Sequence, residues 1–144
     1  MTGKITPFAP TQRATDHEFK LGGVTFRAWD LGGHESVRYL WERFYGGCDA
    51  VIFMVDAADA GRLEEARDEV EELIDAEASK GIPIAVLCNK SDLAMALPPA
   101  ELAKELGLEG FPIYAAGSGA GVAPPPMAGG AGGAPGAAGA AGAA

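Results

Sequence analysis

The chain has 144 residues, and its 20 acidic residues outnumber its 11 lysines and arginines, which gives a net charge of −9. Sequence-independent nucleic-acid binding needs basic residues that displace counterions from phosphate, so this composition excludes nucleic acid as an expected partner. No apolar run reaches the length of a membrane span, and the N-terminus lacks the apolar core of a signal peptide. We therefore expect a cytoplasmic chain.

The charged residues all precede residue 110, and the composition changes after that point. We expect three parts: a divergent N-terminal segment at 1–9, one folded but partial domain at 10–122, and a disordered tail at 123–144. The tail consists almost entirely of Ala, Gly and Pro, which offer too little apolar surface to form a packed core. Cys48 and Cys88 lack metal-binding spacing, so we expect them to be small buried apolar residues.

The first predicted elements form a hairpin. Apolar residues alternate with polar ones at 17–21 and again at 24–30, which predicts two strands. Gly22 and Gly23 lie between them and supply the positive φ angles of a tight turn. Residues 36–45 then predict a short helix.

Strands and helices alternate in the rest of the chain. We expect a strand at 50–56, a helix at 61–80, a strand at 82–88, a helix at 98–106 and a short strand at 111–115. The first of these helices has an acidic face that we expect to be solvated, and an apolar face made of Leu63, Ala66, Val70, Leu73 and Ile74. This order predicts an α/β fold with a mostly parallel sheet, covered on both faces.

Polar clusters follow three of the predicted strands: WDLGGHE, VDAAD and CNKSD. Ligands bind to such sheets at the carboxyl ends of the strands, so we expect these clusters to share one ligand. In CNKSD, the carboxylate of Asp92 offers two parallel acceptors that match the paired N–H donors of guanine, and adenine lacks that donor pair. The aliphatic part of Lys90 would cover the base, and Asn89 would connect neighbouring loops. The alternative is a polar turn in which Asp92 caps a helix.

The WDLGGHE cluster predicts a metal and phosphate site. Asp30 ends a strand and would hold Mg²⁺ through water, because Mg²⁺ keeps much of its hydration in proteins. Gly33 allows its backbone N–H to approach a phosphate oxygen closely, and His34 would stand beside that phosphate. The alternative is a glycine hinge with Asp30 as a helix cap.

These motifs, together with PTQRATDHEFKLGGVTFRAWDLGGHE, VRYLWERFY, VIFMVDAAD, IAVLCNKSDL and ELAKELGL, resemble the Arf/Sar branch of the Ras-like small GTPases. The resemblance extends from Pro10 to about Val122. DLGGHE is most similar to the Sar group, which starts COPII coat assembly, whereas VRYLW is closer to Arf. The resemblance implies a P-loop NTPase fold, a GTP hydrolase with GTP/GDP and Mg²⁺ as cofactors, and a role in ER-to-Golgi protein transport. It also implies a peripheral location at endoplasmic reticulum and Golgi membranes.

The resemblance also implies roles for individual residues. It assigns Mg²⁺ to Thr11 and Asp30, the γ-phosphate to Gly33, the attacking water to His34, and guanine to Asn89, Lys90, Asp92 and the backbone N–H of Ala116. Trp29 and Phe44 match positions that meet coat proteins, exchange factors and GTPase-activating proteins. We expect Trp41 to be a core residue instead.

Some parts of the family pattern are absent from the sequence. The phosphate-binding motif G-x-x-x-x-G-K-[ST] does not occur in the 144 residues. The family's first strand, which lies between the strands at 24–30 and 50–56, has no counterpart, and neither has its membrane helix or its closing helix. We therefore expect an incomplete G domain, a fragment without tight GTP binding. The alternative is a non-catalytic interaction module that binds partners without nucleotide.

Overall fold

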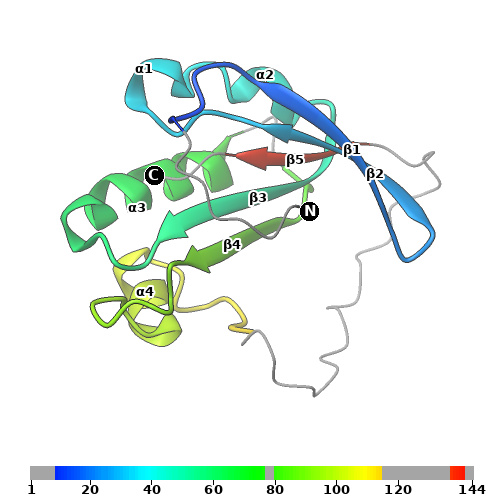
Figure 1. Cartoon of the computed structure of the whole chain (residues 1–144). Coiled ribbons are helices and arrows are strands. Elements are labelled where there is room, and N and C mark those ends of the chain that lie inside the picture. The colour runs from blue at the N-terminus through cyan, green and yellow to red at the C-terminus, as the bar shows by residue number, and fades with distance from the viewer. Residues whose placement is uncertain (1–8, 77–79, 115–136, 142–144) are drawn as a thin grey trace.

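The computed structural model describes residues 9–76, 80–114 and 137–141 (Figure 1). The predicted hairpin is confirmed: β1 (Thr15–Leu21) and β2 (Val24–Asp30) pair in antiparallel fashion. Gly22 and Gly23 form its turn with φ angles of 57° and 82°. Residues with a Cβ rarely adopt these angles, so the two glycines make this tight turn possible.

The rest of the sheet is parallel. Strand β2 pairs with β5 (Ala137–Ala141), β5 pairs with β3 (Cys48–Asp56), and β3 pairs with β4 (Ile84–Asn89), so the strand order is β1-β2-β5-β3-β4. The carboxyl ends of β2, β3 and β4 therefore lie at the same end of the sheet. This arrangement confirms the predicted α/β fold with a mostly parallel sheet.

Strand β5 contradicts two expectations. Disorder was predicted for all of 123–144, and the place between β2 and β3 was expected to be empty, yet Ala137–Ala141 lies there. Gly139 pairs with Trp29 on one side and with Val51 on the other. Unpaired strand edges are costly, and pairing uses backbone N–H and C=O groups that alanine and glycine possess like other residues. Residues 115–136 and 142–144 lie outside the described part.

The helices are shorter than the sequence predicts. The single helix expected at 36–45 is two, α1 (Glu35–Arg38) and α2 (Glu42–Tyr45). Between them, the backbone N–H of Trp41 donates to the carbonyl of Arg38 at 2.8 Å, a three-residue spacing that tightens the chain and ends the α-helical pattern.

The remaining helices flank β4 in the sequence. A 3₁₀ turn, η1 (Ala60–Arg62), leads into α3 (Leu63–Asp75), and α4 (Pro99–Glu105) begins with proline at its first position, where no backbone N–H is needed. No helix within the described ranges has the length and apolarity to cross a bilayer.

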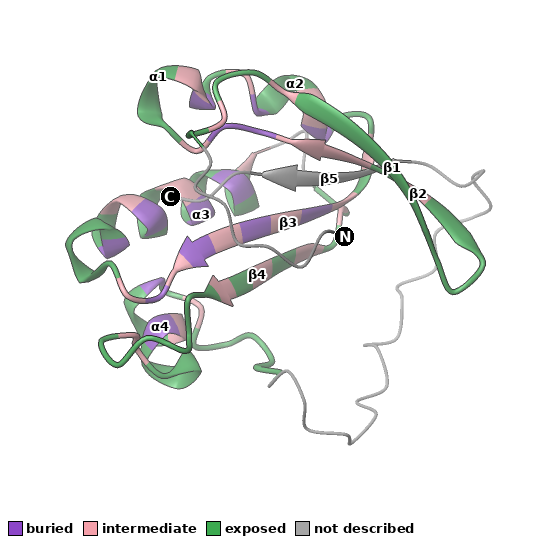
Figure 2. Cartoon of the chain, viewed as in Figure 1, coloured by how far each residue is buried: buried purple, intermediate pink, exposed green. Residues whose placement is uncertain are grey.

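The core lies on one face of the sheet. Buried residues gather on β3 and on the inner sides of α2, α3 and α4 (Figure 2). They include Trp41, Tyr45, Val51, Phe53, Val55, Leu63, Ala66, Val70, Leu73, Leu102 and Leu106. On β4, Leu87 is 48% exposed, and no described helix covers the opposite face, so the prediction of two covered faces is wrong for this part of the chain.

Two smaller expectations have different outcomes. Cys48 and Cys88 are half-buried and pack against the core as expected, and this burial raises the pKa of both thiols. The strand predicted at 111–115 is not formed by Phe111–Tyr114, and Ala115 lies outside the described residues. Pro112 lacks the backbone N–H that a strand ladder uses, which opposes pairing there.

The position of β5 predicts the effect of a proline. We expect Gly139→Pro to lower the free energy of unfolding by about 1 kcal/mol or more, because residue 139 has a strand on each side and proline removes one backbone donor. Urea unfolding measures this change. Gly130→Pro, outside the described strands, is the control. Equal stability of the two variants would contradict the central position of β5.

Candidate functional site

The candidate site lies along the carboxyl ends of the parallel strands. Asp30 ends β2, Asp56 ends β3 and Asn89 ends β4. Since β5 separates β2 from β3, the outer two of these strand ends are three strand spacings apart, roughly 14 Å. The predicted clusters therefore share one edge of the sheet, and a ligand that contacts both ends must be elongated.

The two predicted magnesium ligands are brought together. The hydroxyl of Thr11 donates a hydrogen bond to Oδ2 of Asp30 at 3.1 Å, and both side chains are half-buried. Within the described ranges, no group of three or more His, Cys, Asp and Glu side chains is placed to hold a metal ion. A hydroxyl beside one carboxylate still fits Mg²⁺, which commonly takes one or two protein ligands and completes its shell with water and phosphate oxygens.

Gly32 is a structural requirement that the sequence analysis missed. A Cβ at this position would overlap the backbone carbonyl of Thr11 and come within 2.8 Å of a methyl carbon of Val37. Backbone atoms cannot move aside cheaply, so only glycine allows the Thr11 segment to lie this close to the loop after β2. The pair of adjacent glycines was the sequence signal for this role, and the predicted phosphate contact involves only Gly33.

His34 caps helix α1. Its Nδ1 accepts a hydrogen bond from the backbone N–H of Ser36 at 3.3 Å and lies 2.9 Å from the Ser36 hydroxyl. Because Nδ1 accepts from the amide, a neutral His34 ring carries its proton on Nε2. The exposed Nε2–H is then suited to donate to the oxygen of a water molecule and to orient it, rather than to accept a proton from it. Its predicted role stays a prediction.

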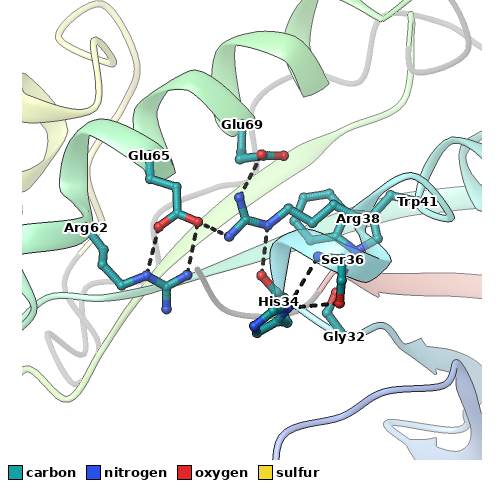
Figure 3. A network of polar contacts seen from close by, with 9 residues as sticks. Gly32, His34, Ser36, Arg38, Trp41, Arg62, Glu65 and Glu69 are labelled. Atoms are coloured by element: carbon teal, nitrogen blue, oxygen red, sulfur yellow. Dashed lines mark hydrogen bonds and ion pairs between the residues drawn. The ribbon is translucent and has the colours of Figure 1, made fainter.

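Arg38 ties the loop after β2 to helix α3 (Figure 3). Its Nε donates to the carbonyl of Gly33 at 2.8 Å, Nη1 donates to Glu69 at 2.8 Å, and Nη2 pairs with Glu65. Only 7% of the Arg38 side chain is exposed. A buried charge is tolerated only with such partners, so all three contacts are needed together.

This network corrects the prediction for the acidic face of α3. Glu65 and Glu69 do not simply face solvent, because they bind Arg38, and Arg62 also pairs with Glu65 at 2.8 Å. The hydrogen bonds from Arg62 and Arg38 lower the pKa of Glu65 to about 2. Burial lowers the pKa of Arg38, but the two glutamates outweigh it and the net pKa is raised.

The guanine-type cluster begins where β4 ends. Oδ1 of Asn89 accepts from the backbone N–H of Lys90 at 2.9 Å, and Lys90 has a left-handed φ of 57°. The Lys90 ammonium binds Oδ2 of Asp56 at 2.5 Å, which lowers the pKa of Asp56 and raises that of Lys90. Asp92 is exposed and binds no other described residue, so its carboxylate is open to a ligand.

Backbone contacts hold the ends of β3 and β4 together. The N–H of Ala57 donates to the carbonyl of Asn89 at 3.0 Å, and the carbonyl of Ala57 accepts from Leu97 at 2.8 Å. Oδ1 of Asp56 accepts from the N–H of Ala58 at 3.0 Å. The VDAAD cluster therefore positions the predicted base-binding residues, a role that its sequence did not reveal.

The aromatic residues near the loop divide into two groups. Trp41 is buried as predicted, and its indole N–H donates to the carbonyl of Gly32 at 2.9 Å. Trp29 and Phe44 are half-buried, with ring centroids 5.4 Å apart. They form one aromatic surface that fits their predicted partner role, which stays a prediction. Ala116 lies outside the described residues.

An α/β sheet with the predicted magnesium ligands Thr11 and Asp30 at one strand end and an NKSD cluster at another is the arrangement of a Ras-like G domain. The comparisons with known proteins agree. The family model described as "ADP-ribosylation factor family" matches residues 1–116. The chain belongs to this family of Arf/Sar small GTPases, and the fold is an incomplete Ras-like domain.

Two relatives show the extent of the match. The chain is 38% identical over 104 residues to "Small COPII coat GTPase SAR1" of Giardia intestinalis, covering 72% of this chain and 54% of the relative. It is also 38% identical over 104 residues to "ADP-ribosylation factor-like protein 3" of Chlamydomonas reinhardtii, covering 72% of this chain and 59% of the relative. The chain thus spans somewhat more than half the length of these curated relatives.

The close approach at Gly32 predicts a strong effect of one methyl group. We expect Gly32→Ala to cost roughly 1–3 kcal/mol of stability and to separate Thr11 from Asp30, because the Cβ overlaps backbone. Thermal unfolding and amide exchange of the Thr11 segment measure both effects. Gly46→Ala is the matched control, since no atom lies within 4 Å of its added Cβ. Equal melting temperatures would contradict the predicted overlap.

The Arg38 network predicts a pH dependence. The pKa of Glu65 is lowered from 4.5 to about 2, so its contribution to stability is present above pH 4.5 and is lost as the pH falls toward 2. We expect Glu65→Gln to cost about 1 kcal/mol at pH 7, because Glu65 is partly exposed and solvent screens it. The difference from the unmodified chain should shrink near pH 3.

Thermal unfolding at the two pH values measures this difference. Glu64→Gln, an exposed neighbour on α3 outside the network, is the control and should leave stability nearly unchanged at both pH values. A Glu65→Gln effect that stays constant from pH 7 to pH 3 would show that the ion pairs do not stabilise the fold.

Proposed function

We propose that this chain carries the switch and base-recognition part of a GTPase that binds and hydrolyses GTP with Mg²⁺. The observation that supports this most is the placement of two unrelated clusters on one edge of the sheet. Thr11 and Asp30 lie at the end of β2, while Asn89, Lys90 and Asp92 follow the end of β4. The separation suits a nucleotide, with phosphates and metal at one end and guanine at the other.

Each group has a distinct task in this proposal. The oxygens of Thr11 and Asp30 would hold Mg²⁺, which would supply positive charge beside the phosphates. Asp92 accepts both guanine N–H donors, and Lys90 exchanges its contact with Asp56 for a position over the base. Nε2–H of His34 donates to the attacking water and orients it.

We further propose a role in vesicle coat assembly and ER-to-Golgi transport, at the cytoplasmic surface of those membranes. The support is the similarity to a relative named for the COPII coat, together with the aromatic surface of Trp29 and Phe44. Half-buried aromatic rings are frequent anchors in protein interfaces. Coat proteins, exchange factors and GTPase-activating proteins would contact this surface.

A second proposal is an interaction module that binds such partners without nucleotide. It is favoured by the lack of G-x-x-x-x-G-K-[ST] among the 144 residues, since that loop grips the α- and β-phosphates. The two proposals make different predictions about nucleotide affinity, and calorimetric titration separates them.

The first experiment compares the 144-residue chain with a fusion that carries a strand and a G-x-x-x-x-G-K-[ST] loop at its N-terminus. We expect the fusion to bind GDP in a Mg²⁺-dependent way. The 144-residue chain should bind roughly hundredfold more weakly or worse, a loss of about 2.8 kcal/mol. Similar GDP affinity of the two chains would contradict the expected need for the loop.

The second experiment tests base recognition with inosine diphosphate, which lacks the guanine amino group. We expect the fusion to prefer GDP over this nucleotide by roughly tenfold or more, because an unpaired acceptor of Asp92 carries a desolvation cost. Asp92→Ala should abolish the preference, and the neighbouring Ser91→Ala should retain it. If Asp92→Ala still discriminates, or if the fusion shows no GDP binding, guanine recognition by this cluster is refuted.

A further inference from the structure

A cavity lies between helices α1 and α2 and helix α3, and Arg38 is one of its lining residues. Its volume is about 290 Å³, and Tyr39, Trp41, Glu42, Tyr45, Glu69 and Glu72 are among its lining residues. Ligand pockets begin at about 300 Å³, so this one is at the lower limit of their size. Its volume suits one side chain rather than a nucleotide.

The cavity carries an excess of negative charge. Arg38 also lines the cavity, but its guanidinium already donates hydrogen bonds to Gly33, Glu65 and Glu69. Glu42 and Glu72 form no ion pair within the described part of the chain. Two carboxylates thus remain available, and nothing described on this face neutralises them.

Tyr45 gives an independent indication that the cavity accepts a ligand. The residue is only 5% exposed, and its hydroxyl forms no hydrogen bond with any described residue. No fully buried side-chain oxygen in the described part is left without a partner, so this hydroxyl keeps some accessible surface, and Tyr45 lines the cavity. Burial, followed by the charges of Glu69, Glu72 and Glu42, raises its pKa well above the usual value, which keeps the hydroxyl protonated.

The aromatic rings complete the chemistry of a cation site. The faces of tyrosine rings attract ammonium and guanidinium groups, and Tyr39 and Tyr45 both line the cavity. Trp41 already has the Arg38 guanidinium 5.9 Å above its ring. Tyr39 is 69% exposed, so it presents a broad surface beside the cavity that a partner's backbone can cover.

We propose that this cavity receives a single lysine or arginine side chain from a partner polypeptide. The ammonium or guanidinium group lies between Glu42 and Glu72, its aliphatic part contacts the rings of Tyr39 and Tyr45, and the hydroxyl of Tyr45 accepts one hydrogen bond from it. The partner's backbone covers the exposed ring of Tyr39. This interaction does not require nucleotide, so its test is independent of the proposed GTPase activity.

The test uses the 144-residue chain and three short peptides with the sequence Gly-Gly-X-Gly-Gly, acetylated and amidated at their ends. X is lysine, acetyl-lysine or glutamate, and n-butylammonium is a fourth probe. Two-dimensional NMR follows the indole N–H of Trp41, which reports on the cavity wall. We expect saturable binding of the lysine peptide, no binding of the two others, and weaker binding of butylammonium.

Two sets of variants locate the binding. Glu42→Gln combined with Glu72→Gln should weaken the lysine peptide roughly tenfold or more, and Tyr45→Phe should weaken it severalfold while keeping the buried ring. Glu64→Gln combined with Glu71→Gln removes the same charge from exposed positions that do not line the cavity, and should change affinity less than about twofold. Thermal unfolding verifies that each variant is folded.

Several results would overturn the proposal. Equal binding of the acetyl-lysine peptide would show that charge is not recognised, and equal weakening by the control pair would show general attraction to an acidic chain. Butylammonium binding as tightly as the peptide would make the cavity a small-amine site and refute a polypeptide partner. No saturable binding of the lysine peptide would refute the site itself.

Discussion

The geometry of the site depends on the buried guanidinium of Arg38. A buried charge without partners is expensive, so Arg38 is stable in this position only while Gly33, Glu65 and Glu69 all remain in contact with it. These partners belong to the loop after β2 and to α3. The loop that carries the predicted phosphate-binding residues is therefore tied to the helical layer, and a movement of one displaces the other. The indole N–H of Trp41 donates to the neighbouring carbonyl of Gly32 and strengthens this connection.

Much of the fold was predictable because its signals are local. Alternation and the Gly22-Gly23 turn defined the hairpin, and three- and four-residue spacing defined α3. The wrong predictions concern features that depend on tertiary contacts, which a local sequence pattern does not specify. Strand β5 supplies backbone partners to β2 and β3, and among the described residues no helix covers the opposite face of the sheet.

The site shows the same division. Clusters such as NKSD and DLGG could be singled out because their residue types and spacing match the chemistry of the ligand that they are predicted to bind, and the structure places them on one edge of the sheet. The contacts that support them were not recognisable. Arg38 meets Glu65 and Glu69 from 27 and 31 residues away, and Lys90 meets Asp56 from 34 residues away. Pairings over such distances depend on how the helices pack, which sequence spacing alone does not specify.

The composition of β5 has a consequence for the sheet as a whole. Its sequence, AAGAA, offers no side chain larger than a methyl group, so its place between β2 and β3 rests on backbone pairing and on its covalent tether to the same chain. A strand with large apolar side chains would gain the same backbone bonds and additional burial. The centre of the sheet is thus an exchangeable position, and the element that occupies it sets the distance between the predicted metal end and the predicted base end of the site.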